Sequence, residues 1–96
     1  MTSFDEFYAG LQAEAEREGP EAVAELRAFE LHFSLARQLG EQRRARHLTQ
    51  TQLAEMSGIA QAEISRIERG QANPTTATLS ALMRALGVAV KLVPAG

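Results

Sequence analysis

Apolar residues recur every three or four positions along most of the chain, which is the spacing that one face of an α-helix requires. Behind an N-cap at Ser3, this spacing predicts a first helix to about Glu18. Gly19-Pro20 interrupts the pattern, and a second helix is expected to open at the proline. The pattern leaves open whether that helix runs unbroken to His47 or restarts near Ser34.

The second half of the chain carries stronger helix-boundary signals. Thr49-Gln50-Thr51-Gln52 has the form of a capping box and predicts a short helix over about residues 50–56. Ser57-Gly58-Ile59 predicts a tight turn, followed by a helix over residues 61–69. A last helix with a leucine-rich face is expected behind Thr75.

Three of the six C-terminal residues 88–93 are the β-branched valine, and the segment lies between Gly87 and Pro94, so it is expected to form one short strand. Because a lone strand has unpaired backbone groups, pairing with a second copy is the simplest solution. The residues assigned to this dimer strand are Val88, Val90 and Leu92. The expected fold class is all-α, with about five helices and this strand, and the expected state is a homodimer.

The charge is distributed unevenly over a chain of 96 residues that is long enough for one domain. The formal net charge is −2, but residues 1–33 hold eight acidic and two basic side chains, whereas residues 34–96 hold four acidic and eight basic ones. A basic segment suits a polyanion such as DNA, and an acidic one suits a basic partner. Two ordinary solvated surfaces are the alternative.

Several classes of protein are disfavoured by the residues that are missing. The sequence has no Cys and no His pair at helical spacing, so no metal site is expected. An enzyme is the weakest alternative and no cofactor is expected, because Asp5 is the sole Asp and no phosphate-binding glycine loop is present. Without a signal peptide or a long apolar run, the protein is expected to be cytoplasmic and not to bind a membrane.

The predicted helix over residues 61–69 has two different faces. At 100° per residue, one side carries Ala60, Ile64 and Ile67 and is expected to face the core. The opposite side carries Ala62, Ser65, Arg66 and Arg69. With Gln61 near the exposed end, this side offers an amide for adenine, a guanidinium for guanine and a small residue for close approach. Two short helices joined by a Gly-containing turn form a helix-turn-helix arrangement, so this face is expected to read DNA.

Residues from about 35 to 93 resemble the Cro/C1-type (XRE) helix-turn-helix family. The most specific elements are LTQTQLA, the Gly58-Ile59 turn, ISRIERG and the spacing to a final Leu-rich helix followed by glycine. The resemblance implies a lambda-repressor-like bundle in which residues 34–87 bind double-stranded DNA at a palindromic operator. The resemblance implies base contacts from Gln61, Ala62 and Arg66, and contacts to the DNA backbone from Gln50, Asn73 and Thr75. Two further residues on the outward side of the helix complete the expected site, Ser65 with the base contacts and Arg69 with the backbone contacts.

The same resemblance implies a buried ion pair between Arg43 and Glu68, with two independent surface charges as the alternative. Two positions depart from the family pattern. Ala60 stands where Ser or Thr often caps the recognition helix, and His47 stands where Gly commonly ends the preceding long helix. Each departure is expected to lower stability or affinity without abolishing the fold. Glu63 is ambiguous, since it can accept from a cytosine or serve its own helix.

The two ends of the chain resemble antitoxins of the HigA and HipB types. In the HipB type, a strand like residues 88–96 pairs across a dimer. The acidic helices of residues 1–33 resemble those of HigA-type antitoxins, which are encoded beside a basic ribonuclease toxin of the RelE fold. The resemblance therefore implies a HigB-like toxin partner, with Phe4, Phe7, Tyr8 and Leu11 as the candidate contact. The alternative is that these side chains pack within their own chain.

The function expected from the sequence is a sequence-specific transcriptional repressor that is also the antitoxin of a type II toxin-antitoxin pair. One alternative is a stand-alone XRE-type regulator without a toxin. Another is a protein-interaction module whose helix-turn-helix is structural. Salt-dependent binding to a palindrome separates a DNA reader from an interaction module.

Overall fold

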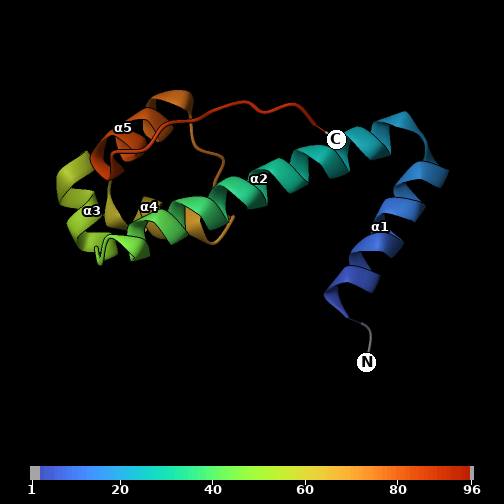
Figure 1. Cartoon of the computed structure of the whole chain (residues 1–96), viewed down its shortest axis with the longest axis horizontal. Helices are drawn as coiled ribbons and strands as arrows, with labels where there is room; N and C mark the ends of the chain where they lie inside the picture. The colour runs from blue at the N-terminus through green and yellow to red at the C-terminus, as the bar shows by residue number, and fades with distance from the viewer. Residues whose placement is uncertain (1–2, 96) are drawn as a thin grey trace. The chain divides into compact units, whose positions relative to one another are not determined.

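The computed structural model describes residues 3–95, and within them it contains five helices and no strand (Figure 1). The helices are α1 (Phe4–Glu18), α2 (Pro20–Ala45), α3 (Gln50–Ser57), α4 (Gln61–Glu68) and α5 (Thr76–Leu86). The chain divides into two compact units, Met1–Ser34 and Leu35–Gly96, and α2 contributes to both. Among the helices described, none is long and apolar enough to cross a membrane.

Side-chain caps fix the starts of three helices where the sequence predicts them. Ser3, Thr49 and Thr75 each accept a hydrogen bond from the backbone N–H three residues on, at 3.0–3.1 Å. At α3 the cap is reciprocal, because the Gln52 side chain accepts from the Thr49 N–H at 2.8 Å. These bonds satisfy donors that the first turn of a helix leaves without a partner.

The long helix α2 runs unbroken past Ser34 to Ala45, which settles the point that the sequence pattern leaves open. It ends in a left-handed turn at His47, whose φ is 55°. There the N–H of Leu48 bonds to the carbonyl of Arg43 at 3.2 Å and that of His47 bonds to Arg44 at 2.9 Å. α5 ends with the same pair of bonds but has a glycine at the left-handed position, so His47 adopts a conformation that glycine accepts more easily.

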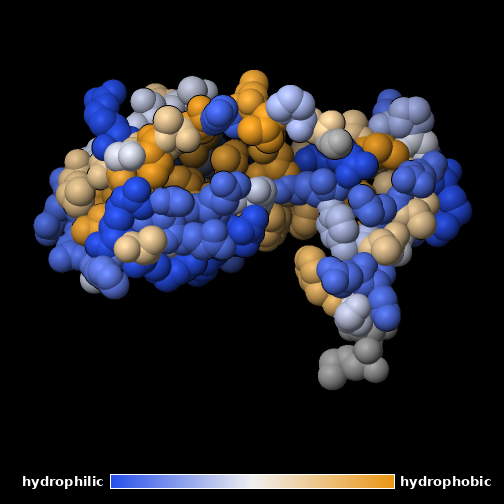
Figure 2. Space-filling model, in the orientation of Figure 1, coloured by the Kyte–Doolittle hydropathy of each residue, from blue (hydrophilic) through white to orange (hydrophobic). Residues whose placement is uncertain are grey.

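One apolar core holds the unit Leu35–Gly96 together, and all four helices of this unit contribute to it. Its buried side chains are Leu39, Leu53, Ile64, Ile67, Leu82 and Leu86. Burying each such side chain stabilises the fold by about 1.5–3 kcal/mol. In Figure 2 apolar side chains of this unit gather between its helices, while hydrophilic side chains cover the surface along α2. The core therefore fixes α4 against α2, α3 and α5.

The unit Met1–Ser34 buries much less of its apolar surface. Among its described residues only Ala15 is buried, and Phe4 and Phe7 are 76% and 58% exposed. Tyr8 is half-buried beside Glu30, and interaction of the phenol with this carboxylate, followed by desolvation, raises the pKa of Tyr8. Phe4 and Phe7 therefore face outward and do not pack into a core, whereas Leu11 lies against the space between α1 and α2.

The predicted C-terminal strand is wrong for the single chain. Val88, Val90 and Leu92 lie in an extended tail without strand pairing, and no strand is present among residues 3–95. The physical reason is that a strand needs a hydrogen-bonded neighbour, and the described residues of one chain supply none. Val88 packs against the core, whereas Val90 and Leu92 are exposed to solvent.

Candidate nucleic-acid interface

The turn between α3 and α4 sets the direction of α4. Gly58 ends α3 in the left-handed conformation with φ 77°, and the Ile59 N–H donates to the Ser57 hydroxyl at 3.1 Å. Ile59 packs against the core, which draws the turn inward. α4 then starts after Ala60 without a side-chain cap, as expected because alanine has no side-chain oxygen to accept a hydrogen bond.

The two faces of α4 differ as the periodicity predicts. Ile64 and Ile67 are almost completely buried, with 1% and 2% exposure. Among the candidate base contacts, Gln61, Ala62 and Arg66 are exposed, and Ser65 is half-buried. An exposed helix face with a short side chain between an amide and a guanidinium fits the width and the donor–acceptor pattern of a major groove. The geometry therefore permits α4 to enter a DNA duplex.

The side chain of Gln61, the first residue of α4, is held by a hydrogen bond to Gln50, the first residue of α3. Its Nε2 donates to Oε1 of Gln50 at 2.8 Å, and Nε2 of Gln50 donates to Oε1 of Glu68 at 3.3 Å. One N–H of Gln61 is thereby used, and its Oε1 and its second N–H are the groups that match an adenine edge. The Gln50 link to Glu68 is a feature that the sequence analysis missed.

Arg43 and Glu68, which are expected to pair, lie in direct bidentate contact across α2 and α4. Nε of Arg43 donates to Oε2 of Glu68 at 2.7 Å and Nη2 donates to Oε1 at 2.8 Å. Nη1 of Arg43 also donates to the Leu48 carbonyl at 2.7 Å. The two side chains are only 12% and 9% exposed, so they are not independent surface charges.

This contact favours the charged form of Arg43. Hydrogen bonding to Glu68, assisted by the attraction of its carboxylate, raises the pKa of Arg43 above its ordinary value, although burial acts in the opposite direction. Glu68 also accepts a hydrogen bond from Gln50, and Gln50 accepts one from Gln61. The ion pair is therefore linked through Gln50 to the first residue of α4. The buried pair thus supports the surface that would meet DNA.

Gly40 leaves room for the Arg44 side chain next to the ion pair, and it was not recognised from the sequence as a site residue. A Cβ at this buried position of α2 would lie 3.4 Å from Oε1 of Glu68 and 3.0 Å from Nη1 of Arg44. A glycine inside a helical pattern indicates close packing in general, which is the one signal that the sequence offers. Which group it approaches depends on the tertiary fold.

The candidate contacts to the DNA backbone lie at the start of α3, at the end of α4 and in the connection to α5. Gln50 is half-buried at the start of α3, Arg69 is exposed at the end of α4, and Asn73 and Thr75 are exposed in the connection to α5. The Thr75 hydroxyl is already used, since it caps α5 and donates to the Thr78 hydroxyl at 3.1 Å. A contact from Thr75 to a phosphate would therefore compete with an existing bond.

Comparison with known proteins identifies the family of this part of the chain. The helix-turn-helix family model matches residues 39–92, more than half of the chain. An uncharacterized HTH-type transcriptional regulator of Haemophilus influenzae is 39% identical over 70 residues, covering 73% of this chain and 71% of the relative. The immunity repressor protein of Bacillus phage phi105 is 41% identical over 51 residues, covering 53% of this chain and 35% of the relative.

A second HTH-type regulator, y4dJ of Sinorhizobium fredii, is 48% identical over 52 residues, which cover 53% of this chain and 68% of the relative. No solved structure matches significantly. The matched segment contains α3, the turn, α4 and α5, which are the elements that form the exposed face and its core. The chain therefore belongs to the XRE-type helix-turn-helix family.

Proposed function

We propose that the protein is a sequence-specific DNA-binding transcriptional repressor that inserts α4 into the major groove. The observation that carries this proposal is the division of α4 into a buried Ile64 and Ile67 side and an exposed side containing Gln61, Ala62 and Arg66. The names of the relatives, HTH-type transcriptional regulator and immunity repressor, agree with it. Occupancy of a promoter by the bound protein would block transcription.

In this proposal the residues divide into two groups. Gln61, Ala62, Ser65 and Arg66 contact bases, whereas Gln50, Arg69, Asn73 and Thr75 contact the DNA backbone. The backbone contacts fix position and the base contacts provide specificity. The excess of basic over acidic residues in 34–96 supports an attraction to phosphates.

The proposed active state is a homodimer. Supporting this, the C-terminal tail exposes Val90, Leu92 and Val93, and contact with a second copy would remove these apolar side chains from water. A two-fold dimer would place two recognition helices about 34 Å apart, one helical turn of DNA. Its operator would then be a palindrome.

Replacing Arg66 with alanine is expected to relax base preference at one position of each half-site by about 1–3 kcal/mol. The reason is that a guanidinium that reads a guanine edge adds discrimination at that base pair only. Gel-shift titrations with duplexes changed at one base pair at a time measure it. Arg84→Ala removes the same charge from the exposed surface of α5 and is expected to keep every preference. Equal weakening of Arg66→Ala on all duplexes would refute the base contact.

A second candidate function is antitoxin activity, favoured by the acidic and apolar surface of the N-terminal unit. Residues 1–33 hold eight acidic and two basic side chains, and Phe4 and Phe7 are exposed. We propose that this unit binds and neutralises a basic HigB-like toxin of the RelE fold while the other unit represses the shared operon. An adjacent gene that encodes a small basic RelE-like protein would support this role, and the absence of such a gene would favour a stand-alone regulator.

A further inference from the structure

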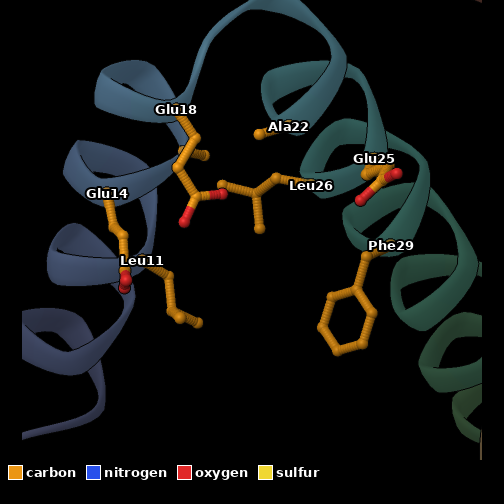
Figure 3. Close-up of a pocket in the computed structure, with 8 residues that line it drawn as sticks. Leu11, Glu14, Glu18, Ala22, Glu25, Leu26 and Phe29 are labelled. Atoms are coloured by element: carbon orange, nitrogen blue, oxygen red, sulfur yellow. The ribbon is translucent and has the colours of Figure 1, made fainter.

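The space between α1 and the first turns of α2 forms an open groove inside the N-terminal unit (Figure 3). Its volume is about 470 Å³. Leu11 of α1 and Leu26 and Phe29 of α2 supply its apolar lining. Figure 3 shows the side chains of Leu11 and Phe29 projecting into the space between the two helices. The groove is therefore an apolar surface that this unit leaves unfilled.

Carboxylates flank this apolar lining on both helices. Glu14 and Glu18 lie one turn apart on α1, and Glu25 lies on α2 (Figure 3). Among residues 3–95, no basic side chain lines the groove. Residues 1–33 contain two arginines, Arg17 and Arg27, and neither is among the residues that line the groove. Arg27 instead pairs with Glu30 at 2.9 Å. The groove thus combines an apolar centre with negative charge on both sides.

We infer that this groove binds a basic amphipathic helix of a partner protein. The apolar stripe of such a helix would contact Leu11, Leu26 and Phe29, and Lys or Arg residues on either side of the stripe would meet the carboxylates. This is the helix-in-groove mode of recognition, in which apolar anchors supply contact area and flanking charges select the partner. The same carboxylates repel phosphate groups, so the groove does not extend the DNA-binding surface.

The inference deepens the second candidate function and rests on it for the identity of the partner in the cell. Binding of a basic helix is nevertheless measurable without that partner. The probe is a labelled synthetic peptide with Leu at helical spacing and Lys on both sides of the Leu stripe. Comparison peptides carry Glu in place of Lys or Ser in place of Leu.

The test measures fluorescence anisotropy with the full chain and two matched triple variants. Glu14→Gln, Glu18→Gln and Glu25→Gln together remove the groove charges, whereas Glu6→Gln, Glu16→Gln and Glu21→Gln remove three exposed charges that do not line the groove. The groove triple is expected to raise the Kd of the Lys peptide about tenfold. The control triple is expected to change it less than about twofold. Neither comparison peptide is expected to bind.

A second pair of variants tests the apolar lining. Leu26→Ala is expected to weaken binding severalfold, and Leu31→Ala, at an exposed position outside the groove, is expected not to. Equal changes in the Kd of the Lys peptide for the two triple variants, or for the two leucine variants, would refute binding in the groove. All variants keep residues 35–96 unchanged, so their gel shifts on DNA report the repressor function separately. If the Lys peptide binds the groove but a RelE-like protein encoded by the adjacent gene does not, the antitoxin role is refuted and the binding of basic helices in the groove is retained.

Discussion

Arg43→Ala is expected to lower the free energy of unfolding by about 3–5 kcal/mol, because it leaves the Glu68 carboxylate buried without its counter-ion. It also removes the donor to the Leu48 carbonyl, which accepts from Arg43 Nη1 at 2.7 Å. For a chain of 96 residues, this is a large part of the total stability. Urea unfolding followed by circular dichroism at 222 nm measures it.

Arg37→Ala is the matched control, because it also removes a paired arginine from α2. Arg37 and Glu41 pair at 3.0 Å, but their side chains are 62% and 50% exposed. An exposed pair one helical turn apart contributes only about 0.3–0.5 kcal/mol. If Arg43→Ala and Arg37→Ala lower the free energy of unfolding by the same amount, the pair of Arg43 and Glu68 does not hold α4 in place.

Ala62→Glu is expected to raise the Kd for the operator at least about 100-fold, since a like charge among phosphates costs several kcal/mol. Ala62 is exposed near the start of α4, where an acidic residue is compatible with the helix dipole. The free energy of unfolding should therefore stay within about 0.5 kcal/mol of the unchanged protein. Gel shifts and urea unfolding on the same preparation separate the two effects.

Ala28→Glu adds the same charge at an exposed position of α2 in the N-terminal unit. It should leave the Kd for DNA within about twofold, because Ala28 lies outside both the unit that contains α4 and the segment that the helix-turn-helix family model matches. Unchanged DNA affinity of Ala62→Glu would mean that this face of α4 does not approach the duplex.

Much of the helical framework is predictable because its signals are local. Thr49 and Gln52 cap α3 through atoms within one turn, and Gly58 and Gly87 allow left-handed ends whatever surrounds them. The buried side of α4 also follows from the spacing of Ile64 and Ile67. Local chemistry and helical periodicity are sufficient for these features.

The remaining features depend on contacts between distant parts of the chain. The C-terminal strand was predicted from the residue types in 88–93, but strand formation needs a pairing neighbour that local composition does not provide. Gly40 and Gln50 meet Glu68 only after α2, α3 and α4 have packed together. The aromatic residues of α1 fitted either a core or a partner by spacing alone, and only the structure shows Phe4 and Phe7 turned outward.

Selection of duplexes from a random pool by the purified protein measures directly whether the exposed side of α4 reads DNA sequence. We expect enrichment of a palindrome with half-sites about 10–10.5 base pairs apart, bound with an affinity that falls steeply as salt rises. Failure to enrich any sequence, with no retarded complex even at low salt, would contradict it.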